Sequence, residues 1–466
     1  MTMRSGVSVA RAGLAIGLAA LAASPVAASP APQQWQAKAR EIYAATMAIP
    51  TVAGRGEVPR MAAYLAEQFR TAGFPSEDIH ILPHGETAAF VVRYRGDGSS
   101  GRKPILLLAH MDVVEAKRED WSYEPFRLTE DNGYFYGRGS ADIKSGVAQL
   151  STALIRLRAE GFVPDRDIIL AFTGDEETTT ESARLLATRW RSLIDAEYAL
   201  NSDGGGGAFQ MSDGKSLGFT FEPSEKTSAV YTLTAINAGG HASRPRSDNA
   251  IYDLASALSR LAAHRFAPQA DDITRTYFRT AAPYRAPEVA AAMRRFADDP
   301  NDAAAGALLA SHLDEDVMTR TTCVATRLDA GHAFNALPQR AVATVNCRIF
   351  PGTAPEAVRE ELAKVVGDNI RVEMDGRAVA AAASPLQMDI LRAYTQAVQS
   401  RFPGVPVIPS MMVGYTDGRE FRAAGIPTYG VSGDWLRLPD DDRIHGRDER
   451  LAVEAFYGGL DHWDSM

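Results

Sequence analysis

Cysteine is scarce in this sequence of 466 residues, and its scarcity excludes two classes of protein. Only Cys323 and Cys347 are present, so neither a disulfide-rich scaffold nor a cysteine-rich zinc site can be built. A metal ion bound by this chain must therefore be held by histidine, aspartate and glutamate. The sequence leaves open whether the two cysteines form a disulfide, which an oxidising compartment would allow, or remain two buried thiols.

Excess positive charge is also absent. Lys and Arg total 49 against 58 Asp and Glu, which gives a net charge of −9. No long run of basic residues occurs, so we expect neither nucleic acid nor an anionic membrane as a partner. Charged residues make up 23% and apolar residues 45% of the chain, which is typical of a globular protein. The length predicts about two or three domains.

Long apolar runs are missing except near the N-terminus. There, Arg4 and Arg11 precede an apolar stretch over residues 12–23, and small residues follow it up to Ser29. The stretch is about half of the ~20 residues that a membrane span needs. This layout predicts a secretory signal peptide over residues 1–29. We therefore expect a secreted or periplasmic protein with no stable membrane insertion after cleavage.

The first part of the mature chain has the rhythm of an α/β sheet. Continuous apolar runs at residues 104–109, 167–172 and 197–201 predict buried parallel strands. Residues 143–159 predict a helix, with Asp142 at the N-cap position. Strand, helix and strand in this order favour a sheet with a helical crossover.

The pattern changes near residue 227. Apolar and polar residues alternate over residues 229–237, 322–328 and 341–349, as in half-exposed antiparallel strands. From residue 385 onward, helix and strand patterns alternate again. We therefore predict one α/β domain made of residues 30–226 and 383–466, and an α+β domain over residues 227–382 inserted into it.

Histidines and carboxylates stand at five places where strands end or helices begin. The residues concerned are His110, Asp112, Asp142, Glu176, Glu177, Asp203 and His445. Ligands of open α/β sheets bind at the carboxyl ends of the strands, where such residues can converge. Two adjacent glutamates beside other carboxylates repel one another unless a cation lies between them. Imidazole nitrogen and carboxylate oxygen are suitable ligands for a pair of divalent ions.

The order of these motifs resembles that of the co-catalytic dizinc exopeptidases and amidohydrolases, which include glutamate carboxypeptidase, aminoacylase and succinyl-diaminopimelate desuccinylase. The matching segments are HMDVV (110–114), GRGSADIKSG (137–146), DEE (175–177), SDGG (202–205), GGHASRP (239–245), FNALP (334–338) and RIHGRDER (443–450). The tract from Trp121 to Phe126 and the late DDRIHG are most similar to the carboxypeptidase S branch. The resemblance implies a zinc-peptidase-type mixed sheet with helices on both faces, and an inserted lid and dimerisation domain.

The resemblance also implies a role for each residue. Two zinc ions, with cobalt or manganese as substitutes, would be bound by His110, Asp142, Glu177, Asp203 and His445, with Asp142 bridging. Asp112 would hold the tautomer of His110. Glu176 would be the general base. His241 would stabilise the oxyanion, in this family often from the partner subunit of a homodimer.

Three residues match the family's substrate-binding positions. Arg348 and Asn335 correspond to an arginine and an asparagine that bind a free carboxylate, although Arg348 could instead pair with a neighbouring acid. Gly414 matches a glycine that lines the pocket. The family commonly has Gly-Gly-Thr-Asp there, whereas this chain has Tyr415 after Gly414, and the bulk of this side chain alters the pocket.

The function implied is cleavage of an amide bond in a peptide or N-acyl amino acid, next to a free carboxylate. The alternative is a two-lobed periplasmic binding protein without catalytic activity, which an acidic, exported chain of two domains would also fit. A binding protein has no need of a bridging carboxylate beside a Glu-Glu pair, so the motifs favour the enzyme.

Overall fold

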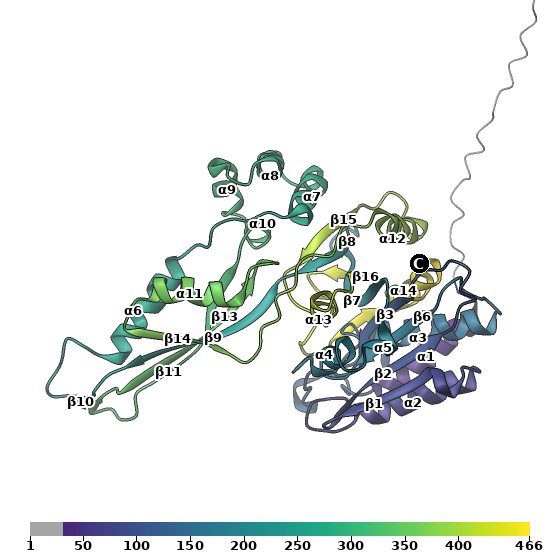
Figure 1. Cartoon of the computed structure of the whole chain (residues 1–466), viewed down its shortest axis with the longest axis horizontal. Coiled ribbons are helices and arrows are strands. Elements are labelled where there is room, and N and C mark those ends of the chain that lie inside the picture. Colours follow the sequence, from purple (N-terminus) through teal and green to yellow (C-terminus); the bar gives the residue numbers. More distant parts are fainter. Residues whose placement is uncertain (1–30) are drawn as a thin grey trace, which may run out of the picture.

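The computed structural model describes residues 31–466 (Figure 1). The predicted signal peptide over residues 1–29 lies outside the described residues. Of the helices in the described part of the chain, none has both the length and the apolar character needed to cross a membrane.

The larger sheet has eight strands and is mixed, as predicted. Across the sheet these are β1 (Ile79–His84), β2 (Thr87–Tyr94), β6 (Ile168–Thr173), β3 (Ile105–His110), β7 (Tyr198–Gln210), β16 (Thr428–Leu438), β8 (Ser216–Glu225) and β15 (Val407–Met412). Strands β6, β3, β7 and β16 run parallel to their neighbours in this group. Strand β2 is antiparallel to both of its neighbours, β1 and β6, and β7 is antiparallel to β8. The three predicted parallel strands are therefore confirmed as β3, β6 and β7.

Helices cover both faces of this sheet, which explains the continuous apolar runs. One face packs on α1 (Gln33–Met47), α2 (Val58–Thr71), α3 (Lys144–Ala159), α12 (Met388–Arg401) and α14 (Val453–Ser465), and the other on α4 (Glu181–Ala187), α5 (Arg191–Ile194) and α13 (Gly418–Ala423). Within β3, Leu107 belongs to the first core and its neighbours Leu106 and Leu108 to the second. Successive side chains of a strand point to opposite faces, so a strand buried on both sides has no polar positions.

The helix predicted over residues 143–159 is α3, which begins at Lys144. The prediction that Asp142 caps this helix is wrong. The N-cap residue is Ile143, and no side chain caps the helix. The carboxylate of Asp142 instead contacts two histidines.

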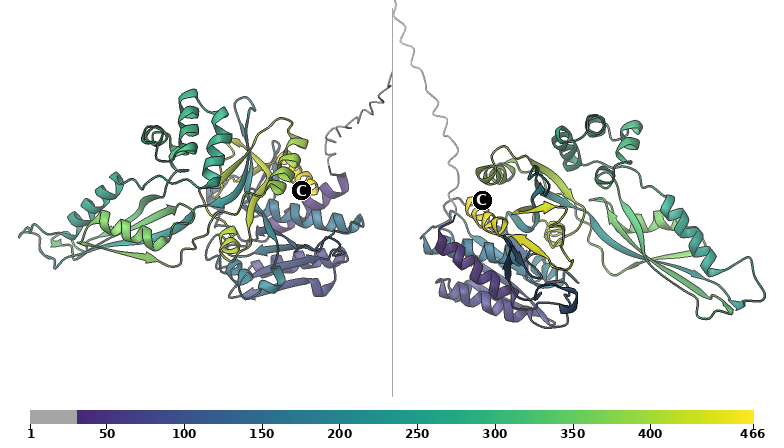
Figure 2. Two further views of the ribbon diagram at one scale, coloured as in Figure 1. Left: turned by 45° about the horizontal axis from the view of Figure 1, so that its top comes forward. Right: turned by 180° about the vertical axis from the view of Figure 1, so that it is seen from behind.

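A second, four-stranded sheet extends away from the first as an arm (Figures 1 and 2). It consists of β11 (Thr322–Ala330), β13 (Arg340–Ile349), β9 (Thr227–Ile236) and β14 (Ile370–Asp375), all antiparallel. The alternating runs thus form antiparallel strands, as predicted. Helices α6 (Ala250–Ala263) and α11 (Pro355–Val366) pack on one face. The short strands β10 (Gly240–His241) and β12 (Ala336–Leu337) pair at the far tip of the arm.

A third group of helices connects the arm to the larger sheet. It comprises α7 (Asp272–Ala281), α8 (Pro287–Asp298), α9 (Ala303–Leu309) and α10 (Leu313–Asp316). Phe278 and Met293 from these helices share a core with Ile408 and Met411 of β15. Helices α7 and α8 of the segment 227–382 therefore share a core with the eight-stranded sheet, while the strands of this segment form a separate sheet.

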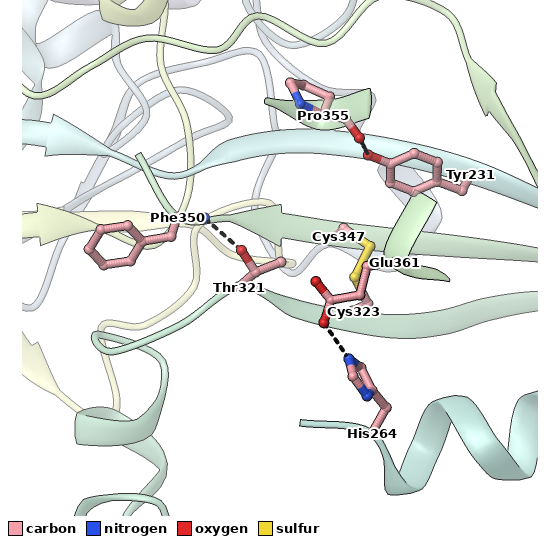
Figure 3. Close-up of a disulfide and its surroundings, with 8 residues drawn as sticks. All are labelled: Tyr231, His264, Thr321, Cys323, Cys347, Phe350, Pro355 and Glu361. Carbon is pink, nitrogen blue, oxygen red and sulfur yellow. Dashed lines mark hydrogen bonds and ion pairs between the residues drawn. A yellow bond between two sulfur atoms is a disulfide. The ribbon is translucent and has the colours of Figure 1, made fainter. Parts of the chain in front are cut away.

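The two cysteines lie opposite each other on neighbouring strands of the arm. Cys323 of β11 and Cys347 of β13 are paired in register and joined by a disulfide, with their Cα atoms 4.1 Å apart (Figure 3). Of the two alternatives left open by the sequence, the structure contains the disulfide.

A small three-stranded sheet places the C-terminal motif. Strands β4 (Thr129–Asp131), β5 (Tyr134–Tyr136) and β17 (Arg450–Ala452) form it, and β17 pairs with β5. Because β17 follows directly after the segment 443–449, this pairing brings that segment to the loop before α3, where Asp142 lies.

Candidate active site

The sheet order brings the predicted ligands together. His110 is the last residue of β3, Glu176 and Glu177 follow β6, and Asp203 lies in β7. These strands are neighbours and parallel, with β3 in the middle. Their carboxyl ends therefore meet at one edge of the sheet, which is the usual ligand-binding edge of such folds.

Asp142 lies between two histidines. Its Oδ1 is 3.0 Å from His110 Nε2, and its Oδ2 is 3.0 Å from His445 Nε2. His110 Nε2 is also 3.9 Å from Asp203 Oδ2, and His445 Nε2 is 3.0 Å from Glu177 Oε1. Each oxygen of Asp142 thus faces a different histidine. Each of these histidines also lies near one further carboxylate, Asp203 for His110 and Glu177 for His445. A carboxylate that bridges two cations has this arrangement.

The electrostatics of the site also fit two cations. Burial, together with the negative charge of neighbouring carboxylates, raises the pKa of Glu176 and Asp203 well above the usual range. Hydrogen bonds to Asp142 and Glu177 raise the pKa of His445 to about 10. Ligand atoms of His110, Asp142 and Glu177, and of His110, Glu176 and Asp203, lie within 4.8 Å of one another. Divalent ions would replace the protons that these groups otherwise share.

The donor set accommodates the predicted division of ligands. His110 and Asp203 would hold one ion, Glu177 and His445 the other, and Asp142 both. All donors are imidazole nitrogen or carboxylate oxygen, which suits zinc, cobalt or manganese.

Asp112 has a wider role than the sequence suggested. Its main-chain carbonyl oxygen, and not its carboxylate, lies within hydrogen-bond distance of His110 Nδ1, at 2.9 Å. The carboxylate is 3.6 Å from that nitrogen. It accepts hydrogen bonds from the backbone N–H groups of Glu176 and Glu177, at 3.1 Å and 3.0 Å. One buried aspartate therefore orients His110 and also fixes the turn that carries both glutamates.

Sequence reasoning missed the ion pair of Arg138 with Glu449. Glu449 accepts hydrogen bonds from the N–H groups of Ala141 and Asp142, at 2.8 Å and 3.1 Å. Arg138 donates to the carbonyl oxygens of His445 and Gly446, at 3.2 Å and 2.9 Å. The pair therefore ties two candidate ligands together. Both residues fall within quoted motifs, but spacing alone did not reveal their contact.

Asp417 was also missed as a member of the site. It lies with His110 and Asp203 around one small cavity, and Thr173 of β6 donates a hydrogen bond to it. Burial raises the pKa of Asp417 to about 7. The signal was present in the sequence, because Asp417 follows Tyr415 and Thr416 in the motif that carries Gly414.

A cavity of about 620 Å³ adjoins the ligands. Its lining includes the predicted residues Asp142, Glu176, Glu177, Asp203, His445, Arg348 and Gly414. Arg348, from β13, is half-buried, and its Nη1 atom is buried without a hydrogen-bond partner. No carboxylate is among the groups that perturb its pKa, which burial lowers. The alternative in which Arg348 pairs with a neighbouring acid is therefore not observed.

His241 and Asn335 lie elsewhere. They adjoin each other at the tip of the arm, where the N–H of Ala242 donates to the Asn335 carbonyl oxygen at 3.0 Å. Both side chains are exposed, and neither lines the cavity. The 10 residues of β9 separate this tip from the larger sheet, a length of about 33 Å. Within one chain, the structure does not bring these two residues to the other site residues.

A doubly covered α/β sheet with histidines and carboxylates clustered at its strand ends defines a metallohydrolase-type site. The chain belongs to Peptidase family M20/M25/M40, whose profile matches residues 106–466. The predicted family is therefore confirmed, and so is the enzyme class of metallopeptidase or amidohydrolase. No feature of the described fold or site favours the binding-protein alternative.

Two relatives illustrate the range of the family. The chain is 30% identical to human N-fatty-acyl-amino acid synthase/hydrolase PM20D1 over 381 residues, which covers 76% of this chain and 71% of that protein. It is 26% identical to mouse aminoacylase-1 over 413 residues, which covers 86% of this chain and 88% of that protein.

Solved structures share the fold. The M20 metallo-carboxypeptidase Sso-CP2 of Sulfolobus solfataricus superposes with a TM-score of 0.69 at 17% identity, covering 92% of this chain and 98% of that one. The di-peptidase Dug1p of Saccharomyces cerevisiae gives 0.65 at 18% identity, with coverages of 93% and 95%. A dinuclear metal-binding M20 peptidase of Bacillus subtilis gives 0.57 at 13% identity, with coverages of 93% and 98%.

Proposed function

We propose that this chain is an exported hydrolase that uses two zinc ions to cleave an amide bond next to a free carboxylate, in a peptide or an N-acyl amino acid. The observation that carries the proposal is a single cavity lined by Arg348 and by four of the five candidate metal ligands, namely Asp142, Glu177, Asp203 and His445. The names of the aminoacylase and PM20D1 relatives support N-acyl amino acids, and that of the carboxypeptidase supports peptides. Cobalt or manganese would suit the same donors.

The protein's own groups account for the proton transfers. When bound, a pair of divalent ions supplies Lewis acidity and a water of lowered pKa. Glu176 lies beside His110 and Asp203 in the cavity wall. Its carboxylate would accept a proton from the attacking water and pass it to the nitrogen of the leaving amine. The Asp112 carboxylate holds Glu176 in place by accepting a hydrogen bond from the backbone N–H of Glu176.

Arg348 would bind the free carboxylate of the substrate. A guanidinium can hold a carboxylate through two parallel N–H···O bonds. Arg348 lines the cavity, and its buried Nη1 has no hydrogen-bond partner. An acidic partner would occupy the same N–H groups, so its absence leaves them available to a substrate.

We also propose a homodimer formed through the arm. Large apolar side chains are exposed on the arm, including Ile236 at 67%, Leu328 at 63% and Phe334 at 100%. The outer strand β11 has an unpaired edge in its sheet, and such a combination favours contact with another copy. A partner's arm could then bring His241 and Asn335 to this cavity as oxyanion and substrate ligands.

A mixing experiment tests the dimer. Glu176→Gln and His241→Ala should each abolish activity, because each removes one part of the site. After subunit exchange, a mixed dimer combines an intact Glu176 with an intact His241 of the partner, so part of the activity should return. Mixed dimers that form but stay inactive would contradict the shared site.

Export rests on the predicted signal peptide over residues 1–29 and is supported by the disulfide, because such bonds persist in oxidising compartments. Fractionation of cells expressing the full chain, with N-terminal sequencing of the mature protein, tests it. Recovery of an uncleaved chain from the cytoplasm would refute this part of the proposal.

A substrate screen tests the reaction. Zinc-loaded protein is assayed against dipeptides and N-acyl amino acids, each with a free carboxylate and as the carboxamide. We expect hydrolysis of the free acids, and slower but measurable hydrolysis with a raised KM when the carboxylate is blocked. Equal rates on acids and amides would refute the role of Arg348, and no hydrolysis of either class would refute the proposed reaction.

A further inference from the structure

Tyr415 is the residue at which this chain departs from the common Gly-Gly-Thr-Asp motif, and it lies against two arginines. The Cζ atom of Arg419 is 4.2 Å from the centre of the Tyr415 ring, and that of Arg348 is 5.4 Å from it. Both distances are within the ~6 Å range of cation–π attraction. Tyr415 and Arg348 line the cavity, whereas Arg419 is absent from its lining.

The contacts of the two arginines differ. Arg419 donates a hydrogen bond to Thr180 Oγ1 at 3.1 Å, in the loop that follows the two glutamates. Arg348 has a buried Nη1 atom without a hydrogen-bond partner, and the centre of the Tyr415 ring lies 5.4 Å from its Cζ atom. The ring is therefore the favourable contact that holds the Arg348 guanidinium at the cavity.

The loop that carries the ring is itself held in place. Glu225 accepts hydrogen bonds from both the N–H and the hydroxyl of Thr416, at 2.7 Å and 3.0 Å. Glu225 also forms a buried ion pair with Arg422. The residue next to Tyr415 is thus fixed through two contacts, which hold the backbone that carries the ring.

We propose that Tyr415 is a positioning residue that holds Arg348 by its ring face and leaves the guanidinium edge free for the substrate's carboxylate. This inference rests on the proposed function. An aromatic face attracts the flat side of a guanidinium and does not use its N–H groups. A carboxylate partner would use those groups and would compete with the substrate. The ring therefore supplies position without neutralising the charge.

The test compares Tyr415→Leu and Tyr415→Phe with Tyr284→Leu as a control. Tyr284 is 56% exposed and lies outside the cavity lining. Each protein is assayed on the best free-acid substrate of the screen and on its carboxamide. Tyr415→Leu should raise KM for the free acid by about 2- to 30-fold, the range of one cation–π contact, with kcat changed much less. Tyr415→Phe should retain most of the wild-type KM, because the ring remains.

The carboxamide separates positioning from pocket shape. Its KM should not change in Tyr415→Leu, since no carboxylate is present for Arg348 to bind. An unchanged KM for the free acid would overturn the inference, and so would an equal rise for acid and carboxamide. Thermal unfolding of each variant identifies any that fail to fold, in which case Tyr415→Phe and Tyr415→Trp replace the leucine variant and should stay near wild type.

A binding measurement keeps this inference distinct from the proposed reaction. Calorimetry with a reduced, non-hydrolysable analogue of an N-acyl amino acid needs no turnover. If the wild type binds this analogue but hydrolyses nothing, the proposed reaction fails while the inference stands or falls on the binding data. Equal affinity in wild type and Tyr415→Leu would overturn the inference even in an active enzyme.

Discussion

The ion pair of Arg138 with Glu449 provides the sharpest prediction from the structure. Glu449→Gln keeps the size of the side chain and removes its charge. The side chains of both residues are nearly inaccessible, at 3% for Arg138 and 1% for Glu449. The substitution therefore leaves the Arg138 guanidinium buried without its counter-charge. It also places an amide N–H₂, which is itself a donor, against either this guanidinium or the backbone N–H groups of Ala141 and Asp142.

The expected magnitude follows from these contacts. Removing one partner of a buried ion pair typically costs about 3–5 kcal/mol of stability. Arg138 retains its bonds to the His445 and Gly446 carbonyl oxygens, so we expect a loss near the lower end, about 3 kcal/mol. Because the pair also orients Asp142 and His445, metal affinity should fall by about 10- to 100-fold.

Urea unfolding of the metal-free protein measures the first effect, and competition with a chromogenic zinc chelator measures the second. Glu454→Gln is the matched control, because Glu454 is 79% exposed and its pairing with Arg437 is long, at 3.4 Å. It should change stability by less than about 0.5 kcal/mol. The double variant Arg138→Met/Glu449→Gln should be less destabilised than the sum of the two single variants, because no unpaired charge remains.

Three results would each refute a part of this reasoning. A Glu449→Gln protein as stable as the wild type would show that the buried charges are not coupled. Full additivity of Arg138→Met and Glu449→Gln in the double variant would show the same. Normal metal affinity despite lost stability would separate the pair from the candidate ligands.

Three further predictions concern the metal site and the arm. Glu176→Gln should bind zinc with wild-type stoichiometry and lose about 10²- to 10⁴-fold in kcat, the usual contribution of a general base; wild-type turnover would remove Glu176 from the reaction. Strong chelation should abolish hydrolysis, and added zinc or cobalt should restore it; activity that survives verified metal removal would exclude a metal-dependent reaction. Replacing both Cys323 and Cys347 with alanine opens a loop with a sequence separation of 24. The free energy of unfolding, measured by urea titration, should fall by about 3 kcal/mol. An unchanged value would show that the disulfide adds no stability.

Much of the fold was predictable from local patterns. A strand covered on both faces needs an uninterrupted apolar run, and β3, β6 and β7 have such runs. The arm strands have one covered face, so their apolar residues alternate. The candidate ligands were also predictable, because parallel neighbouring strands must end at one edge. The N-cap assignment of Asp142 failed because residue type and position are shared by a cap and a metal ligand.

What the sequence determined by itself was the family, the two patterns of strands and the set of residues able to hold two metal ions. These follow from residue type, order and periodicity, which are properties of the chain. The tertiary structure decided which groups meet: the Asp112 carboxylate with the N–H groups of the glutamate turn, Glu449 with Arg138, and Arg348 with the Tyr415 ring instead of an acid. It also placed β10, which contains His241, at the tip of the arm, and His241 does not line the cavity. Such contacts join segments up to about 300 residues apart, and only the packing of the sheets brings those segments together.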